Sequence, residues 1–243
     1  MASSACCAAG PPVTIDYTPK GTMSKVGDID TYFIGSGPKS LIVAYDIFGY
    51  SSQTKQVCDK LATAGYNVAM PDFFKGKPWM LDNFPPKDRD ELVAWINSSG
   101  DWTTVVLPMT TAVMSHMKSE KGAETFGFMG FCWGGKMCMQ AAAMGSESGI
   151  VATACVHPAM LTPEMASEVK VPMLIMPSKD EPDFAPLKEE LDKKDFGEKC
   201  RLHRFDDMHH GFCSARGDWA IPEQAVRASE AIGLFQKFFD DSL

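Results

Sequence analysis

The sequence lacks any stretch of roughly 18 or more consecutive apolar residues, so it contains no candidate for a membrane-spanning helix. Basic residues are fewer than acidic ones, with 23 Lys and Arg against 31 Asp and Glu in 243 residues. The formal net charge of -8 argues against a nucleic-acid-binding protein, which would present a basic face. No repeat with a period of about 20 to 50 residues is present, which excludes a solenoid.

The eight cysteines lack the spacing of a disulfide or zinc framework. Apart from the adjacent pair Cys6 and Cys7 they are scattered, and none forms a CxxC motif. We therefore expect reduced thiols, a cytoplasmic location, and neither a metal nor a cofactor. The first residues lack the basic and apolar regions of a secretory signal, so residues 1–12 are predicted to be a flexible tail. Lipid attachment at Cys6 or Cys7 is an alternative that no motif supports.

Short apolar runs alternate with amphipathic segments over residues 13–243. The predicted strands are 28–35, 40–49, 66–74, 123–131, 149–158, 171–180 and 199–207. The predicted helices are 51–65, 87–99, 102–119, 134–145, 185–195 and 222–243. The first strand alternates polar and apolar residues, which favours antiparallel pairing, whereas continuous apolar runs are typical of buried parallel strands. This order predicts a single α/β domain with a mostly parallel central sheet flanked by helices.

Reactive side chains follow three of the predicted strands. In a parallel sheet, ligands bind at the carboxyl ends of the strands, so functional residues are expected in the loops directly after them. Cys132, Asp180 and His210 occupy such positions.

The segment Gly130-Phe131-Cys132-Trp133-Gly134 has the G-x-nucleophile-x-G spacing of a nucleophile elbow, with cysteine in place of serine. Glycines two positions before and after the nucleophile remove side chains that would clash in a sharp strand-to-helix turn. The thiol would then lie at a helix N-terminus, which favours the thiolate, and the backbone N–H of Trp133 would face a developing oxyanion. The alternative is a small buried cysteine that fills a tight turn.

A carboxylate and a histidine follow the cysteine in the chain order typical of hydrolase triads. Asp180 is the first candidate for the acid because it stands just past a buried strand, with Asp183 and Glu181 as alternatives. His210 and His209 are both candidates for the base. In such a triad the histidine takes the thiol proton, and the cysteine attacks an ester or thioester carbonyl to form an acyl-enzyme.

Four motifs, "IVAYDIFGY", "GFCWGGK", "SKD" and "HHGF", occur in this order, and with them the chain resembles the dienelactone hydrolase family (carboxymethylenebutenolidases). The resemblance implies a single α/β-hydrolase domain with a Cys-His-Asp triad of Cys132, His210 and Asp180. It selects His210 over His209 and makes the N–H of Ile47 the second oxyanion donor. It further implies a hydrolase of small esters or lactones. We expect a monomer or homodimer, and charge and hydropathy predict neither nucleic-acid nor membrane partners.

Asp46 departs from the bacterial pattern of this family, which has a glutamate that contacts the resting thiol. We expect Asp46 either to modulate the thiol or to order its loop by accepting backbone N–H groups. Arg216 is a candidate for binding a substrate carboxylate, or alternatively a surface arginine. Candidate residues of an apolar substrate pocket are Phe48, Tyr50, Trp79 and Phe212.

Two other function classes are compatible with the sequence. One is a ligand-binding protein without turnover on a hydrolase fold. The other is a redox-responsive protein in which Cys138 resolves an oxidised Cys132. Six residues of separation place these two cysteines on different faces of the predicted helix, which argues against the redox alternative.

Overall fold

The protein, seen in a computed structural model that describes residues 10–243, contains one eight-stranded sheet. The strand order is β1-β2-β4-β3-β5-β6-β7-β8. The strands are β1 (Thr22–Val26), β2 (Ile29–Ile34), β3 (Lys39–Ala44), β4 (Asn67–Pro71), β5 (Thr125–Phe131), β6 (Ile150–Val156), β7 (Met173–Met176) and β8 (Arg201–Leu202). Strand β2 pairs antiparallel with β1 and β4, and all pairs from β4 to β8 are parallel.

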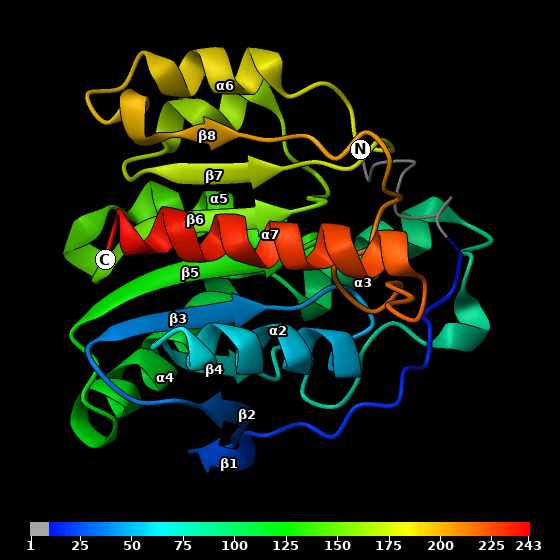
Figure 1. Cartoon of the computed structure of the whole chain (residues 1–243), viewed down its shortest axis with the longest axis horizontal. Coiled ribbons are helices and arrows are strands. Elements are labelled where there is room, and N and C mark those ends of the chain that lie inside the picture. The colour runs from blue at the N-terminus through cyan, green and yellow to red at the C-terminus, as the bar shows by residue number, and fades with distance from the viewer. Residues whose placement is uncertain (1–9) are drawn as a thin grey trace.

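Helices cover both faces of this sheet. They are α2 (Ser52–Thr63), α3 (Arg89–Ser99), α4 (Leu107–Glu120), α5 (Trp133–Met144), α6 (Ala185–Asp192) and α7 (Pro222–Asp240). Figure 1 shows α2 and α7 side by side in front of the sheet, with α4 and α5 behind it. The predicted α/β fold with a mostly parallel sheet is therefore confirmed.

The structure corrects several predicted boundaries. Strand β1 was not predicted, because its sequence TMSKV is mostly exposed and carries no apolar pattern. The strand predicted over 199–207 consists of Arg201–Leu202 plus one isolated bridge between Ser178 and Phe205. A π-helical turn, η2 (Trp102–Val106), precedes α4, and Pro108 lies in the first turn of α4, where a missing N–H costs nothing.

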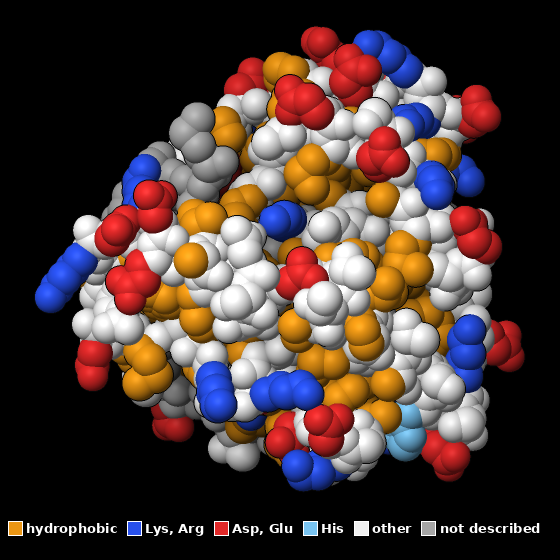
Figure 2. Space-filling view, turned by 180° about the vertical axis from the view of Figure 1, so that it is seen from behind, with side chains coloured by type: hydrophobic (Ala, Val, Ile, Leu, Met, Phe, Trp, Pro, Cys, Tyr) orange, Lys and Arg blue, Asp and Glu red, His pale blue; other side chains and the backbone are white. Residues whose placement is uncertain are grey.

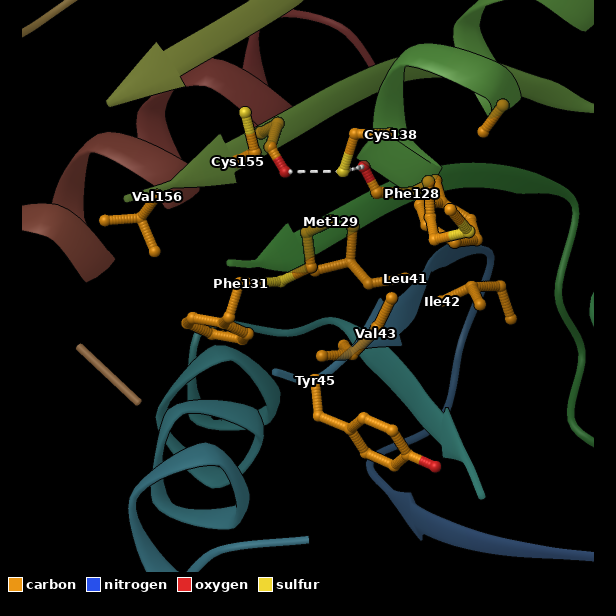
Figure 3. Close-up of a cluster of buried hydrophobic side chains, with 14 of the residues drawn as sticks. Leu41, Ile42, Val43, Tyr45, Phe128, Met129, Phe131, Cys138, Cys155 and Val156 are labelled. Carbon is orange, nitrogen blue, oxygen red and sulfur yellow. Dashed lines mark hydrogen bonds between the residues drawn. The ribbon is translucent and has the colours of Figure 1, made fainter. Parts of the chain in front are cut away.

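The core lies on both sides of the central strands. Figure 3 shows side chains of β3 and β5, including Leu41, Val43 and Phe128, packed with residues of α5 and β6. The thiol of Cys138 on α5 donates to the carbonyl of Ala154 at 3.2 Å. The six cysteines of the described residues are all buried and none forms a disulfide, so within residues 10–243 no disulfide supports the core.

On the face seen in Figure 2, acidic and basic side chains are mixed, and small apolar areas lie between them. This face therefore has no large patch of one charge sign. Within residues 10–243, no helix combines the length and the apolar character that crossing a bilayer requires. The predicted tail over residues 1–12, including Cys6 and Cys7, lies mostly outside the described residues.

Candidate active site

Cys132 forms the sharp turn between β5 and α5. Its backbone has φ 53° and ψ -112°, a conformation that residues other than glycine rarely adopt. Such strain persists only where the surroundings enforce it, and it is concentrated at functional sites. The side chain is 2% exposed, at the N-terminus of α5.

Two glycines permit this turn, as the sequence predicted. A Cβ on Gly130 would lie 2.1 Å from the carbonyl oxygen of Gly134. A Cβ on Gly134 would lie 2.3 Å from the carbonyl oxygen of Ala44 at the end of β3. The elbow therefore requires close backbone contact on both sides of the cysteine, and only glycine allows it.

The loop after β6 fixes the elbow from a second direction. The carbonyl of Cys132 accepts hydrogen bonds from the N–H groups of Gly135 and Ala159, both at 2.9 Å. Pro158 packs so closely on Gly135 that a Cβ there would lie 2.4 Å from the proline ring. The position of the thiol is thus determined by two neighbouring strands as well as by its own helix.

His210 is held by two adjacent carboxylates through different atoms. Glu181 Oε1 lies 2.6 Å from His210 Nδ1, and both side chains are fully buried. Asp180 Oδ2 instead accepts the backbone N–H of His210 at 2.8 Å. The ring contact predicted for Asp180 is therefore made by Glu181, while Asp180 orders the loop that carries the histidine.

The other candidates for acid and base lie elsewhere. His209 Nε2 is 3.3 Å from Gln224 Oε1 on α7, and its Nδ1 is 2.9 Å from the carbonyl of His210. Asp183 accepts the N–H of Ala185 at the start of α6 and is exposed. Neither of these side chains takes part in the buried His210–Glu181 pair.

The loop after β3 carries Asp46 and Ile47. Asp46 Oδ1 accepts the N–H of Phe48 at 2.9 Å, and Oδ2 accepts the hydroxyl of Ser214 at 2.7 Å and the N–H of Ala215 at 3.2 Å. Burial raises the pKa of Asp46, and these hydrogen bonds oppose that shift. Asp46 therefore joins the loop of the expected oxyanion donor Ile47 to the loop that follows His210.

His157 follows β6 and lies beside His210. The centroids of the two rings are 5.1 Å apart, and Phe131 and Phe212 pack on other sides of His157. Neither ring nitrogen of His157 has a hydrogen-bond partner among the described residues, and the residue is fully buried. Burial lowers the pKa of His157 well below its usual value, so the ring is neutral.

A cavity of about 360 Å³ opens beside the Ile47 loop. It is lined by Pro12, Phe48, Tyr50, Ser51, Pro78, Trp79, Met80, Leu81, Asp82 and Ala215. Three of the four predicted pocket aromatics therefore line one cavity. Phe212 lies elsewhere, fully buried against Phe205 and His157.

Arg216 is 4% exposed and packs behind the cavity wall. Its Nε donates to the carbonyl of Gly10 at 2.7 Å, and its guanidinium lies 5.0 Å from the ring centroid of Phe48 and 4.9 Å from that of Phe84. Arg216 thus supports Phe48 of the wall from behind and is not a surface arginine.

Sequence reasoning ranked Glu181 below Asp180 and did not single out Ser214. The adjacent carboxylates of Asp180 and Glu181 both follow β7, and no sequence pattern distinguishes which one reaches the ring. Among residues 10–243 there is also no cluster of three or more His, Cys, Asp or Glu side chains suited to a metal ion.

Comparison with known proteins identifies the family of this chain. The sequence profile of the dienelactone hydrolase family matches residues 29–243. An uncharacterized AIM2 family protein of Schizosaccharomyces pombe is 35% identical over 237 residues, covering 92% of each chain. A carboxymethylenebutenolidase homolog of Mus musculus is 28% identical over 228 residues and 89% of each chain.

Solved structures share the fold. The crystal structure of a dienelactone hydrolase from Anabaena variabilis superposes with a TM-score of 0.62 at 16% identity, covering 93% of this chain and 98% of the other. The sheet order, the helices on both faces and this superposition identify the domain as an α/β-hydrolase fold. With the family profile matched over nearly its whole length, the chain belongs to the dienelactone hydrolase family.

Proposed function

We propose that this protein is a cysteine-dependent hydrolase of small esters or lactones, with Cys132 as nucleophile, His210 as base and Glu181 as the acid of the triad. The observation that carries the proposal is the buried His210–Glu181 pair, located at the same sheet edge as the strained Cys132 turn. A hydrolase that uses a thiol needs this combination, because the carboxylate fixes the tautomer of the histidine and stabilises the imidazolium.

The reaction follows from these groups. His210 takes the proton of the Cys132 thiol, and the sulfur attacks the ester carbonyl to give a tetrahedral oxyanion, which the N–H groups of Ile47 and Trp133 stabilise. The C–O bond then breaks, and His210 returns the proton to the departing alkoxide, leaving a thioester on Cys132. Water, deprotonated by His210, attacks the thioester and releases the carboxylic acid and the free thiol.

We assign Asp46 the loop-ordering role. Both carboxylate oxygens are engaged by the N–H groups of Phe48 and Ala215 and by the Ser214 hydroxyl. These bonds set the position of Ile47 directly beside it, so Asp46 acts on the oxyanion site through the backbone.

The buried environment of Cys138 argues against a redox partnership with Cys132. Its thiol donates to the carbonyl of Ala154, and burial raises its pKa well above the usual value. A resolving cysteine needs thiolate character and access, and Cys138 has neither. The free, scattered thiols of residues 10–243 support the proposed cytoplasmic location.

Acyl-enzyme trapping tests the function. The protein is mixed with p-nitrophenyl acetate, quenched in acid, and analysed by intact and peptide mass spectrometry. We expect an acetyl group on Cys132, and we expect Cys132→Ala to lose both the adduct and turnover. Cys138→Ala is the matched control, because it removes a buried thiol from the same helix and should leave the adduct in place. An active Cys132→Ala variant would overturn the proposal, and ester binding without any adduct would favour a ligand-binding protein instead.

A further inference from the structure

We infer that the cavity beside the Ile47 loop binds the apolar acyl chain of an uncharged ester, and that it selects against acyl groups that end in a carboxylate. The inference rests on the proposed hydrolase function and specifies its substrate class.

The cavity wall and the expected oxyanion site form one structural unit. Phe48, which lines the cavity, directly follows Ile47. The N–H of Trp79, also in the wall, donates to the carbonyl of Ile47 at 2.9 Å. Ala215 lines the cavity from the opposite loop, and its N–H is bonded to Asp46. A carbonyl bound at the Ile47 N–H therefore has this cavity next to it.

The order of the strands indicates which half of the ester occupies the cavity. Cys132 follows β5, in the middle of the sheet, while Glu181 and His210 follow β7 and β8 on one side. Phe48 and Trp79 follow β3 and β4 on the other side. The leaving oxygen must lie near His210, because it receives its proton there. The acyl chain then extends away from His210, toward β3 and β4 and into the cavity.

The side chains of the cavity suit an uncharged chain. Most of the lining is aromatic or aliphatic, and Asp82 is its one charged side chain among the described residues. The cavity has no lysine or arginine in its lining to neutralise a carboxylate, and Asp82 would repel one. Its volume of about 360 Å³ lies at the small end of the range for ligand pockets, which suits a short or medium acyl chain.

Arg216, a buried cation packed on Phe48 of the cavity wall, already has other partners. The Gly10 carbonyl occupies its Nε, and the rings of Phe48 and Phe84 stack on the guanidinium. Recruiting this arginine to a substrate carboxylate would break contacts that hold the cavity wall together. The arginine therefore stiffens Phe48 and keeps the wall apolar.

A matched ester series tests this inference. The substrates are p-nitrophenyl acetate, butyrate and hexanoate, together with p-nitrophenyl hemisuccinate, which matches butyrate in chain length but ends in a carboxylate. Each buried methylene should raise kcat/KM by about threefold to fourfold. The kcat/KM for the hemisuccinate should be lower than that for butyrate by roughly tenfold or more, because the carboxylate must be desolvated beside Asp82.

Substitutions of two exposed residues that line the cavity, Leu81 and Asp82, test whether the chain-length and charge preferences arise there. Leu81 is 56% exposed, so Leu81→Ala should fold normally while weakening the preference for hexanoate over acetate. Asp82→Lys should raise kcat/KM for the hemisuccinate relative to butyrate. Met23→Ala is the control, because Met23 is a similarly exposed apolar residue on β1 outside the cavity lining.

The outcomes distinguish failure of the cavity assignment from failure of the hydrolase function. Cys132-dependent hydrolysis with a flat chain-length profile, or with hemisuccinate preferred, would overturn the cavity assignment and leave the hydrolase function intact. Loss of chain-length preference in Met23→Ala, equal to that in Leu81→Ala, would also overturn it. If no ester in the series acylates Cys132, the hydrolase function itself fails.

Discussion

At the scale of single residues, two neighbouring carboxylates have different tasks at His210. Glu181 bonds the ring, so Glu181→Gln should leave the fold intact but remove the negative charge that stabilises the imidazolium. We expect kcat for a p-nitrophenyl ester to fall by about 10³-fold to 10⁴-fold, as in serine hydrolases that lose the equivalent charge. Steady-state kinetics on folded protein, checked by circular dichroism, measure this.

Asp180→Asn is the matched control for that substitution. It retains an oxygen that can accept the His210 N–H and does not alter the ring contact. We expect a loss of no more than about tenfold, with most of the effect on loop order. A larger loss in Asp180→Asn than in Glu181→Gln would show that the acid was assigned to the wrong carboxylate.

The chain order of the candidate residues predicted which loops form the site. It did not predict whether Asp180 or Glu181 contacts the His210 ring. Asp180 and Glu181 are adjacent, both acidic, and both at the end of β7. Which one contacts Nδ1 depends on how the loop closes, with the Glu181 carboxylate also accepting the N–H of Ser178. Such a loop geometry arises from tertiary contacts with Met208 and Phe205, far away in sequence.

His157 makes folding sensitive to acid. Because burial lowers its folded pKa, the unfolded chain takes up a proton below about pH 6.5 that the folded protein does not. The free energy of unfolding should therefore fall as the pH drops below this value, with His157 contributing up to about 1.4 kcal/mol per pH unit. In His157→Phe this part of the slope should disappear, as measured by urea unfolding between pH 5 and pH 8.

The partly exposed His116 provides the control for that experiment. It also packs on a phenylalanine ring, Phe33, at 5.6 Å. His116→Phe should retain the acid sensitivity of the parent protein. An unchanged pH slope in His157→Phe would contradict a buried neutral histidine at this position.

At the scale of elements, helix α5 favours alanine at position 134, whereas the sharp turn at Cys132 requires glycine there. Alanine normally stabilises a helix interior by about 1 kcal/mol relative to glycine. Here a Cβ would lie 2.3 Å from the carbonyl oxygen of Ala44, so Gly134→Ala must shift α5 away from β3. We expect Gly134→Ala to lower the free energy of unfolding and to reduce acylation of Cys132.

Gly233 in α7 is the matched helical glycine. Apart from its chain neighbours and the adjacent backbone of α7, no atom of residues 10–243 lies within 4 Å of a Cβ placed there, so Gly233→Ala should gain up to about 1 kcal/mol in urea unfolding. If both alanine variants are stabilised alike, the close contact at the elbow does not constrain the fold.

The sequence pattern was sufficient for elements that bury an apolar face and insufficient for those that do not. Strands β5 and β6 are apolar runs and were predicted closely, whereas the strand predicted over 40–49 ends already at Ala44, where the Asp46–Ile47 loop begins. Strand β1 has no buried face, so its only signal is backbone pairing with β2. Strand β8 is assigned only to Arg201–Leu202, although the chain stays beside the end of β7 as far as the isolated bridge between Phe205 and Ser178. No local sequence pattern indicates where the regular pairing stops.

At the scale of the whole molecule, the first described residues are bonded both to α2 and to the loop that follows His210. Tyr17 and Lys20 both donate to the buried Asp59 of α2, and Arg216 donates to the carbonyl of Gly10. Pro12, between these anchors, lines the cavity. Residues 10–21 thus connect the loop after His210 to α2, and Pro12 contributes to the wall of the proposed substrate pocket.

Gln53 of α2 connects this segment to the loop after His210. Its buried Nε2 lies 2.8 Å from the carbonyl of Val13, 3.0 Å from that of Gly217 and 3.4 Å from that of Ala215. Gln53→Ala removes this donor from the carbonyls of Val13 and Gly217, while the carbonyl of Ala215 keeps its bond from the N–H of Val13 at 2.8 Å. Loss of these side-chain bonds should cost about 1 to 3 kcal/mol of unfolding free energy. Because Pro12 and Ala215 line the cavity, KM for the hexanoate ester should rise more than KM for the acetate ester.

Gln56, one turn further along α2 and half-buried, isolates the effect of these bonds from the loss of a glutamine. Hydrogen exchange at residues 11–14 and 215–217 should accelerate in Gln53→Ala and remain unchanged in Gln56→Ala, because only the former variant removes the side chain that bonds both segments and leaves the Val13–Ala215 backbone bond to hold them. Equal exchange in the two variants would mean that the segment is held by other contacts, such as the Arg216–Gly10 bond, and that the pocket wall does not depend on α2.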